Sequence, residues 1–551
     1  MYPTFRTPPP IPYDFGVSAQ PDLRVYDLGH LGLVASVLDS IRLVETVDRL
    51  VGPRPGEKVS TGMALKAAIL NALGFVASPL YLFGHFFQGK PTELLLGPGI
   101  TPDLLNDDRM GRMLDTLYAA GVTGVFLEVA REARKAFPFP VRALHADATS
   151  FHVHGQYEGL GEEVGAIRIT HGYSRDHRPD LKQWVMNLVC ADTGGIPLLF
   201  APGDGNQSDR EALVPLLAHY RQALDLGEVV VLDGAGYSRE NLRTLEGFSW
   251  VLRVPATLKE ARALLEGEFP REAWTPLLPG YRGLEVERSY GGVRQRWLLV
   301  ESEARAREEE EGLRRRVARA EGEAAKVLGR LLSRRFACEA DARRALEEAG
   351  GRLPYHRLVY LGVQEERHRG RVGRPRKGEA PLAVSYRLLA RLEVDQGKLE
   401  RARRGLGRFL LATNVLDREA LPALEVLGRY KDQTRTVERG FRFLKDPLFF
   451  SGSTFLKRPE RVMALGMVMA LALLVYALGE WVLRQRLEET ASSLPDQKGK
   501  PTQRPTLRWV FQLFIWVRLA WLGDRPLVLN LTSHHETAVR LLGAQRYYLL
   551  E

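Results

Sequence analysis

The sequence predicts a mixed α/β fold that follows a helical N-terminal region and is interrupted by a long insertion. Residues 28–137 carry apolar side chains at spacings of three and four, which is the pattern of amphipathic helices. Residues 138–255 alternate short apolar runs with helical segments, which is typical of strands and helices packed into one sheet. A length of 551 residues, 45% of them hydrophobic and 26% charged, leaves room for about two to four domains.

The first predicted domain spans residues 1–137. Residues 1–23 are rich in Pro and aromatic side chains and predict an extended arm, after which LGLVASVLDSIRLVETVDRL and MALKAAILNALGFV predict helices. Thr101 is expected to cap the helix in TPDLLNDDRMGRMLDTLYAAG. Positive and negative residues nearly balance here, so binding of DNA ends and dimerisation are both open as roles of this domain.

Residues 138–255 are expected to form the first part of the α/β domain. The predicted elements are three strands, of which DTGG turns the third into a hairpin, followed by helix, strand and helix. In order they are VRALHADATSFHVHG, VGAIRITHGYS, WVMNLVCADTGGIPLLFAPGD, DREALVPLLAHYRQALDL, EVVVLDGAGYS and SRENLRTLEG. The Val-rich run EVVVL predicts a strand that is buried on both faces.

Residues 256–404 are predicted to be an insertion of mixed α and β structure. Strands are expected around YRGLEVERSYGGVRQRWLLVES, followed by a charged helix over residues 301–334 that pairs with residues 339–349 in a solvated two-helix arm or with a partner helix. Residues 405–485 supply the second part of the α/β domain, with a strand at GRFLLATNV and a helix from Tyr430. Residues 486–551 predict a basic linker and a C-terminal helical segment.

The net charge and the cysteine content indicate which binding partners and which cellular compartment to expect. A formal net charge of +10 favours an acidic partner, with nucleic acid considered before a membrane surface. Two cysteines, Cys190 and Cys338, are too few for a disulfide framework and fit a reducing cytosol. The uncharged run VMALGMVMALALLVYALG, residues 462–479, is interpreted as a buried core helix rather than a membrane span.

Three carboxylates are candidates for chemistry. Asp147 and Asp233 each follow an apolar strand, so both are expected at or near a carboxyl end, although Asp233 could instead cap the next helix. In TVERGFRFLKDP, a core stripe is formed by Val437, Phe441 and Leu444, and the same spacing is repeated one position over by Glu438, Arg442 and Lys445. Arg435 would lie one turn before Glu438 on the same helix face, and a salt-bridged helix face is the alternative.

Five segments in order resemble those of bacterial DDE transposases of insertion sequence family four, in its sixteen-thirty-four branch. They are LHADATSFHVHG, HGYSRDHRPDLKQ, GDGNQSD, VVVLDGAGYSREN and TVERGFRFLKDPLFF. Each segment alone is a weak signal, and their common order makes the resemblance specific. The helical N-terminal domain and the insertion before Glu438 resemble that branch as well, so the likeness covers most of the chain.

The resemblance implies a ribonuclease-H-like catalytic domain, interrupted by the α+β insertion, in which Asp147, Asp233 and Glu438 hold two Mg²⁺ ions, with Mn²⁺ as a substitute. The signature around the family's Glu places a Lys at Lys445, which implies a contact to the phosphate of the transposon end. Tyr430 and Arg435 are each one position off that signature, and Thr434 occupies the position expected for the Arg.

Two basic segments are further candidates for DNA binding. The loop HGYSRDHRPDLKQ offers Arg178 and Lys182 to a phosphate, unless its Asp176 and Asp180 neutralise the cations. GRPRK in the insertion resembles an AT-hook, a short extended segment that inserts arginines into the minor groove. Its candidate contacts, with one flanking residue, are Arg371, Arg374, Arg376 and Lys377.

Histidines and tryptophans near these motifs are assigned structural roles. His145, His152 and His154 crowd around Asp147, but no cysteine or further histidine cluster supports a zinc site, so they are interpreted as strand residues. Trp250, Trp274 and Trp297 could stack a displaced base as in related transposases, but core packing is the expected fate of each.

The sequence thus predicts a cytoplasmic, nucleoid-associated transposase that binds terminal inverted repeats, cleaves DNA and joins the 3′ ends to target DNA. A dimer or higher oligomer is expected on DNA, no membrane partner is expected, and family likeness allows a hairpin intermediate. The alternatives are a ribonuclease-H-like nuclease without strand transfer and a non-catalytic DNA-binding protein descended from a transposase.

Overall fold

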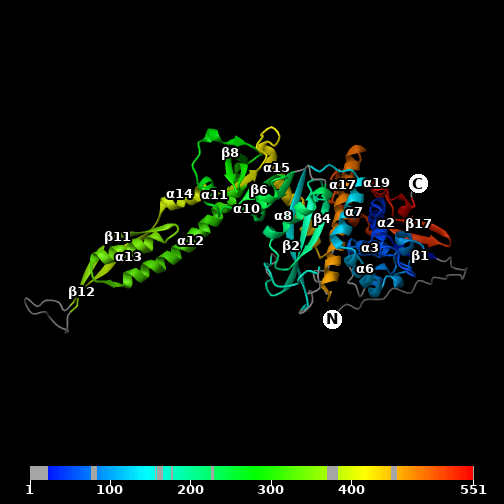
Figure 1. Ribbon diagram of the computed structural model, residues 1–551, viewed down its shortest axis with the longest axis horizontal. Coiled ribbons are helices and arrows are strands. Elements are labelled where there is room, and N and C mark those ends of the chain that lie inside the picture. Colours follow the sequence, from blue (N-terminus) through cyan, green and yellow to red (C-terminus); the bar gives the residue numbers. More distant parts are fainter. Residues whose placement is uncertain are drawn as a thin grey trace, which may run out of the picture. The chain divides into compact units, whose positions relative to one another are not determined.

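The computed structural model describes residues 23–75, 83–155, 157, 165–174, 178–224, 229–368, 383–447 and 456–549 (Figure 1). The chain divides into two compact units. The first combines Met1–Val229 with Asp432–Glu551, and the second is the continuous stretch Val230–Lys431. The class is mixed α/β, as the sequence predicts.

The N-terminal part of the first unit is helical, as expected. Its helices are α1 (Leu31–Ser40), α2 (Leu43–Val51), α3 (Thr61–Ala72), α4 (Phe83–Phe87), α5 (Thr92–Leu96), α6 (Asp107–Ala119) and α7 (Val122–Ala136). Thr101 was the wrong cap: it precedes the short 3-10 helix η2 (Pro102–Leu104) and makes no side-chain cap hydrogen bond. Asn106 caps α6 instead, because its side chain accepts a hydrogen bond from the Arg109 amide at 2.9 Å.

The apolar run of residues 462–479 lies inside helix α17 (Pro459–Glu489), which is the core helix of the first unit. It packs against α3, α6, α7 and strand β4 (Pro197–Gly203). Among the described residues, α17 is the one helix that is long and apolar enough by itself to cross a membrane. The bent pair α6 and α7 passes the same test only if the two helices are taken together as one span. In this structure 94% of the apolar window of α17 is buried, as the core-helix interpretation expects.

Three antiparallel strands of the first unit run in the order β4, β3 (Lys182–Ala191), β2 (Ala143–Val153). DTGG forms the expected turn between β3 and β4, with Gly194 and Gly195 both at positive φ. The strand expected at VGAIRITHGYS is wrong for its described residues, where only the bridge from Thr170 to Gln183 forms. The Arg168 amide and side chain bond Asp204 instead, which removes that segment from a strand ladder.

The expected helix after β4 forms α8 (Asp209–His219) and α9 (Arg221–Leu224). The C-terminal segment is not simply helical, which corrects the expectation for residues 486–551. It contains α18 (Leu507–Leu513), β16 (Arg518–Leu522), β17 (Arg525–Leu529), α19 (Ser533–Leu541) and α20 (Gln545–Tyr548). β16 lies between β17 and the N-terminal strand β1 (Leu23–Asp27), so a partner from the other end of the chain makes this segment a strand.

The sheet of the second unit has the order β5 (Val229–Leu232), β6 (Ser249–Val254), β13 (Arg408–Thr413), β9 (Val293–Ser302), β8 (Tyr281–Tyr290), β7 (Thr275–Pro276). β5 is buried along its length, and helices α10 (Arg239–Thr244) and α11 (Lys259–Leu265) follow β5 and β6 in the chain. Trp250, Trp274 and Trp297 are 8% exposed or less, so the core prediction for them is confirmed.

Beyond this sheet, the expected two-helix arm contains more than helices. Helix α12 (Glu303–Ser333) runs beside β12 (Ala383–Val394) and β11 (His356–His368), as Figure 1 shows. α13 (Glu339–Gly351) packs on this hairpin, and β10 (Arg335–Phe336) adds a third strand. A small core of Phe336, Ala342, Leu346 and Leu388 forms between them, so α12 finds its apolar partner within the arm. α14 (Gln396–Arg404) returns the chain to the sheet.

The helix expected from Tyr430 is two helices. α15 (Ala423–Arg435) starts seven residues before Tyr430 and ends at Arg435, and α16 (Val437–Leu444) begins after Thr436. Thr436 has φ −105° and ψ −98°, which is outside helical geometry. Arg435 and Glu438 therefore do not share a helix face, and that expectation is wrong.

Candidate active site

Asp147 lies in the middle of β2 rather than at its end, because the strand continues to Val153. The sequence placed it near a carboxyl end, but pairing with β3 extends β2 in unbroken register, with Asp147 opposite Leu188. The carboxylate is partly buried and accepts a hydrogen bond from the Ala148 amide at 2.8 Å. Burial raises the pKa of the Cys190 thiol, and the nearby negative charge of Asp147 raises it further.

Glu438 is carried by α16, which packs against β2 and β3. Val437, Phe441 and Leu444 are buried, so the core stripe expected from the sequence is confirmed. Glu438 itself is exposed, in the first turn of the helix. The first unit therefore brings the strand of Asp147 and the helix of Glu438 together, although 290 residues separate the two in the chain.

Close contacts fix the position of α16. A Cβ at Gly195 would lie 3.1 Å from the Thr436 Cα, and a Cβ at Gly440 would lie 2.9 Å from the Leu473 Cδ2 atom of α17. These two glycines let the β3–β4 turn and α17 approach the helix closely. Phe443 also stacks on Tyr476 of α17, with ring centroids 4.4 Å apart.

A buried carboxylate ties α16 to α17. Glu480 of α17 is 3% exposed and receives Arg439 of α16 at 2.5 Å and Arg484 at 2.9 Å. Its other oxygen accepts the Leu507 amide at 2.9 Å, at the start of α18. Because Arg439 is the residue after Glu438, this network holds the first turn of α16. Sequence reasoning missed this network, because its partners come from distant segments of the chain.

Asp233 belongs to the second unit and follows β5 directly, as predicted. It is exposed and makes no side-chain cap hydrogen bond to the 3-10 helix η3 (Gly234–Gly236) that follows, so the capping alternative is wrong. Ser238 is the residue that caps α10. A Cβ at Gly234 would lie 3.6 Å from the Arg253 carbonyl oxygen, which places Asp233 beside the carboxyl end of β6.

Tyr430 accompanies Asp233 in the second unit. Burial raises the pKa of Tyr430, the negative charge of Asp233 raises it further, and a hydrogen bond and the positive charge of Arg253 oppose both. The tyrosine ring lies 6.0 Å from the Phe409 ring. Sequence reasoning missed Arg253, because its relation to Asp233 arises across the sheet and leaves no local pattern.

Within the described residues, no group of three or more His, Cys, Asp or Glu side chains is placed to hold a metal ion. Asp147 and Glu438 lie in the first unit and Asp233 in the second. The three carboxylates still suit the donor chemistry of Mg²⁺, which prefers hard oxygen ligands. Two are exposed and one is partly buried, so ions in solution can reach them.

Comparison with known families decides what kind of protein carries these residues. The family "Transposase DDE domain" matches residues 141–475, which is more than half of the chain and includes Asp147, Asp233 and Glu438. The chain belongs to the DDE transposase family. A second family, described as a domain of unknown function (DUF4277), matches residues 23–131.

Other comparisons add little to this assignment. No curated protein matches the transposase chain. One solved structure, "Cryo-EM structure of piggyBac transposase synaptic complex with hairpin DNA (SNHP)", aligns with 87% of this chain and 79% of its own at 9% identity and a TM-score of 0.36. A likeness of that size carries no inference about this transposase.

The candidate DNA contacts near α16 differ in their surroundings. The Lys445 ammonium lies 5.6 Å from the centre of the Phe151 ring, and Phe151 and Asp147 share one face of β2 by alternation. Lys445 is therefore on the Asp147 face of the transposase strand, near Phe151, which lies about 13 Å along the strand from Asp147. Arg435 and Arg442 are exposed, and Arg442 donates to the Thr434 carbonyl oxygen at 3.4 Å.

The loop before β3 confirms part of the alternative in which acidic residues of the loop neutralise its cations. Arg178 forms two hydrogen bonds to Asp180, at 2.9 and 2.7 Å, so its charge is matched locally. Lys182 is partly buried at the start of β3. Residues 175–177 lie outside the described residues, and so do the AT-hook candidates Arg371, Arg374, Arg376 and Lys377. The latter segment connects His368 of β11 to its pairing partner Ala383 of β12.

The histidines around Asp147 have separate surroundings. His145 and His152 are an odd number of residues apart on β2, so they face opposite sides of the sheet. His145 is buried, and burial lowers its pKa to about 4. The His152 Nε2 atom shares a hydrogen bond with the Ser174 hydroxyl at 3.0 Å. These positions suit strand residues rather than ligands of one ion.

Proposed function

We propose that this chain is the transposase of a bacterial insertion sequence of family four, in its sixteen-thirty-four branch. It binds the terminal inverted repeats of its element, cleaves the 3′ ends and joins them to target DNA. The observation that carries the proposal is the packing of α16, with Glu438, against β2, with Asp147, inside the segment that matches the transposase DDE domain. Asp233 at the end of β5 supplies the third carboxylate of the family pattern.

Asp147, Asp233 and Glu438 are the proposed ligands of two Mg²⁺ ions, which Mn²⁺ can replace. When bound, such a pair activates the attacking oxygen and stabilises the leaving oxygen of a phosphodiester. The side chains contribute negative charge and hard oxygen donors, and their exposure leaves ligand positions open to DNA. The catalytic domain that this requires is ribonuclease-H-like, interrupted by an insertion over residues 256–404.

The basic residues of the proposed site bind phosphates. Lys445, on the Asp147 face of β2, contacts the phosphate of the transposon end, and the exposed Arg442 and Arg435 supply further positive charge. Tyr430 lies next to Asp233 and orients the DNA strand that reaches this carboxylate. Lys182 holds a flanking phosphate, whereas Arg178 contributes less because Asp180 already binds it.

The remaining parts are assigned to DNA ends and assembly. Residues 1–137 bind the element's ends or form the dimer that concerted joining of two ends requires, and the AT-hook segment adds minor-groove contacts. The net charge of +10 supports a polyanionic partner. The protein acts in the cytoplasm, on nucleoid DNA.

The test uses a DNA fragment that carries the element's own termini, incubated with the purified protein and Mg²⁺. Asp147→Asn, Asp233→Asn and Glu438→Gln each remove one charge with little change of shape. We expect each to lower cleavage by at least about a thousandfold while leaving end binding within about threefold of wild type. Glu211→Gln, which alters an exposed acid on α8, is the matched control and should cleave normally.

Three outcomes would contradict parts of the proposal. Wild-type cleavage by any one of the three variants removes that residue from the site. Cleavage without joining of a 3′-hydroxyl oligonucleotide to plasmid DNA identifies a nuclease without strand transfer. End binding without cleavage in either Mg²⁺ or Mn²⁺ identifies a non-catalytic descendant of a transposase.

A further inference from the structure

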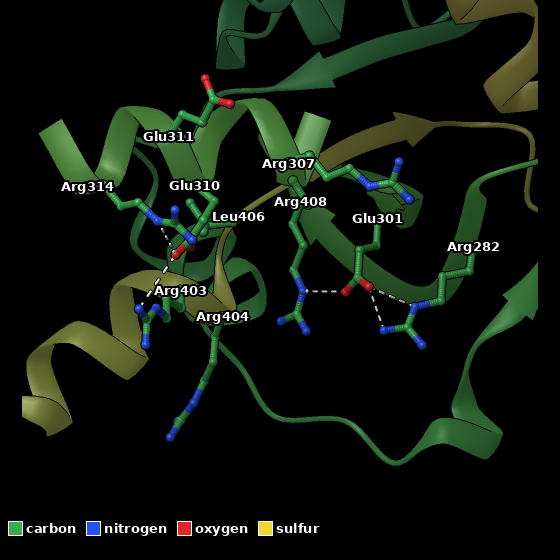
Figure 2. A pocket seen from close by; sticks show the side chains of 11 residues that line it. Arg282, Glu301, Arg307, Glu310, Glu311, Arg314, Arg403, Arg404, Leu406 and Arg408 are labelled. Carbon is green, nitrogen blue, oxygen red and sulfur yellow. Dashed lines mark hydrogen bonds and ion pairs between the residues drawn. The ribbon is translucent and has the colours of Figure 1, made fainter. Parts of the chain in front are cut away.

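A groove lined with arginine lies in the second unit between α12, α14 and the ends of β8, β9 and β13. Its basic side chains come from four of these elements and face a common space, which Figure 2 shows. They are Arg282, Arg307, Arg314, Arg403, Arg404 and Arg408. Among the described residues that line the groove, the acidic ones are Glu301, Glu310 and Glu311.

The carboxylates of the groove do not balance its guanidinium groups. Glu301 is shared by Arg282 and Arg408, at 2.5 and 3.0 Å. Glu310 is likewise shared by Arg314 and Arg403, at 3.6 and 3.5 Å, and Glu311 points away from the arginines (Figure 2). Each shared carboxylate thus leaves one positive charge over, so the groove attracts an anion.

Two of the arginines belong to the framework of the groove. Arg408 is 11% exposed and donates to the Leu265 and Gly267 carbonyl oxygens at 3.2 and 2.8 Å. Its guanidinium and that of Arg282 lie over the buried Trp274 ring, at 5.3 and 4.8 Å. Cation–π contacts and Glu301 hold both in place. The floor of the groove is therefore rigid and charged.

The arginines of α12 are arranged for a ligand that is long and solvated. The side chains of Arg307 and Arg314 are 83% and 75% exposed. They are seven residues apart, which is two turns on one helix face and about 10 Å. The ion pair of Arg307 with Glu303 spans 3.9 Å, and that of Arg314 with Glu310 spans 3.6 Å, so neither forms a tight hydrogen-bonded pair.

The groove lies at the same edge of the sheet as Asp233. Arg408 pairs with Glu301 at the carboxyl end of β9, and Leu410 of the same strand pairs with Val254 at the carboxyl end of β6. Asp233 lies beside that end of β6. Phe409 connects the two places, because its ring contacts Tyr430 at 6.0 Å and the Arg305 guanidinium at 5.7 Å.

We propose that this groove binds the sugar–phosphate backbone of duplex DNA next to the strand that reaches Asp233. The inference rests on the proposed function and adds a second contact surface to it. Guanidinium groups form charge-assisted hydrogen bonds with phosphate oxygens, and such contacts position DNA without reading its sequence. Arg307, Arg314 and Arg403 contact the phosphates, Arg404 is held by Glu268 at 2.7 Å, and Arg282 and Arg408 supply the charged floor.

The test compares three double variants by the salt dependence of duplex binding, without divalent ions and on DNA of arbitrary sequence. Arg307→Ala with Arg314→Ala removes two groove charges that are exposed and therefore dispensable for folding. Arg319→Ala with Arg330→Ala removes two exposed charges farther along the same helix as a matched control. Arg307→Lys with Arg314→Lys keeps the charge and tests whether charge alone is enough.

The groove alanine variant should bind about tenfold more weakly at about 0.1 M salt. The slope of log K against log salt should become shallower by about two, since each phosphate contact contributes about 0.9. The control should keep the wild-type slope, and the lysine variant should keep most of it. Equal slopes for the groove and control variants overturn the groove proposal, even if the wild type cleaves its termini normally. Failure of the wild type to bind or cleave DNA would instead overturn the proposed function.

Discussion

Asp147 shows how a single position depends on its neighbours in the sheet. The sequence around it alternates, because Ala146 and Ala148 are small apolar residues on both sides of the acid. Both alanines are 1% exposed, whereas the carboxylate keeps access to solvent. The two alanines point to the opposite face of β2, and the face of the acid is shared with Phe151 and, through its ring, Lys445. The chemistry of this face is therefore set by residues four positions and almost 300 positions away.

His30 gives a prediction at the same scale. Its ring is 5% exposed, stacks on Phe511 at 4.2 Å and bonds the Leu73 carbonyl oxygen at 2.8 Å. Burial lowers its pKa from 6.5 to about 4, so the unfolded chain binds more protons between these values. Stability should therefore be full above pH 6.5 and fall as the pH drops toward 4, with about 2–3 kcal/mol lost from this group at pH 4.5.

The measurement is urea unfolding of wild type and His30→Gln at pH 7 and pH 4.5. Glutamine can still donate to the Leu73 carbonyl oxygen but does not titrate. Between pH 7 and pH 4.5, the free energy of unfolding of the variant should therefore fall by about 2–3 kcal/mol less than that of the wild type. His154→Gln, at an exposed histidine, is the control and should follow the wild type. The same loss on acidification in His30→Gln would show that His30 does not cause it.

At the scale of elements, α16 depends on contacts from the rest of the first unit. Its eight residues are too few for a stable helix in isolation, so packing against β2, β3 and α17 has to supply the stability. Glu480 holds the first turn of the helix through Arg439, next to Glu438. The orientation of a proposed metal ligand thus rests on a carboxylate of another helix.

Glu480→Gln tests this dependence. The change leaves Arg439 and Arg484 without a charged partner, which should lower the free energy of unfolding by about 2 kcal/mol, since both arginines retain some solvent. Hydrogen exchange of the α16 amides should accelerate more than that of the middle of α17. DNA cleavage should fall by about tenfold or more, while DNA binding is kept.

Glu488→Gln on the same helix is the control, because the partner of Glu488 is Arg504, which is 80% exposed. It should change neither hydrogen exchange in α16 nor cleavage. If Glu480→Gln lowers stability but exchange in α16 and cleavage stay at wild-type values, Glu480 is a core residue without influence on Glu438.

At the scale of the whole molecule, the first unit is built from both ends of the chain. β1 pairs with β16, and the Tyr548 hydroxyl donates to the Gly29 carbonyl oxygen at 2.8 Å across 519 residues. The core helix α17 (Pro459–Glu489) also comes from the second half of the chain and covers α3, α6 and α7. The N-terminal helices therefore cannot bury their apolar faces until the end of the chain has been made.

This arrangement predicts the effect of truncation. A chain of residues 1–229 lacks α17 and should leave the apolar faces of the N-terminal helices uncovered, so it should not unfold cooperatively. Co-expression of residues 432–551 as a separate chain should restore a cooperative thermal transition, which circular dichroism can follow. A cooperative transition in the truncated chain alone would contradict this prediction.

The sequence by itself determined the features whose physical cause is local. The run at residues 462–479 is apolar on every face and so becomes a buried helix, and DTGG turns because its glycines accept positive φ. The same holds for the buried stripe of Val437, Phe441 and Leu444, whose spacing fits one helix face. The order of the five motifs was likewise enough to indicate the transposase family, which the match over residues 141–475 confirmed.

The tertiary structure alone decided the features that depend on distant partners. β16 is a strand because β1 pairs with it, and the helix expected from Tyr430 breaks at Thr436 where Gly195 approaches. Arg253 of β6 meets Tyr430 of α15 only in the folded unit. The arginines of the groove are spread over more than 120 residues and form no motif in the sequence. Strand pairing between distant segments and the clustering of distant charged side chains form only when the chain folds. Local secondary-structure propensity therefore does not predict them.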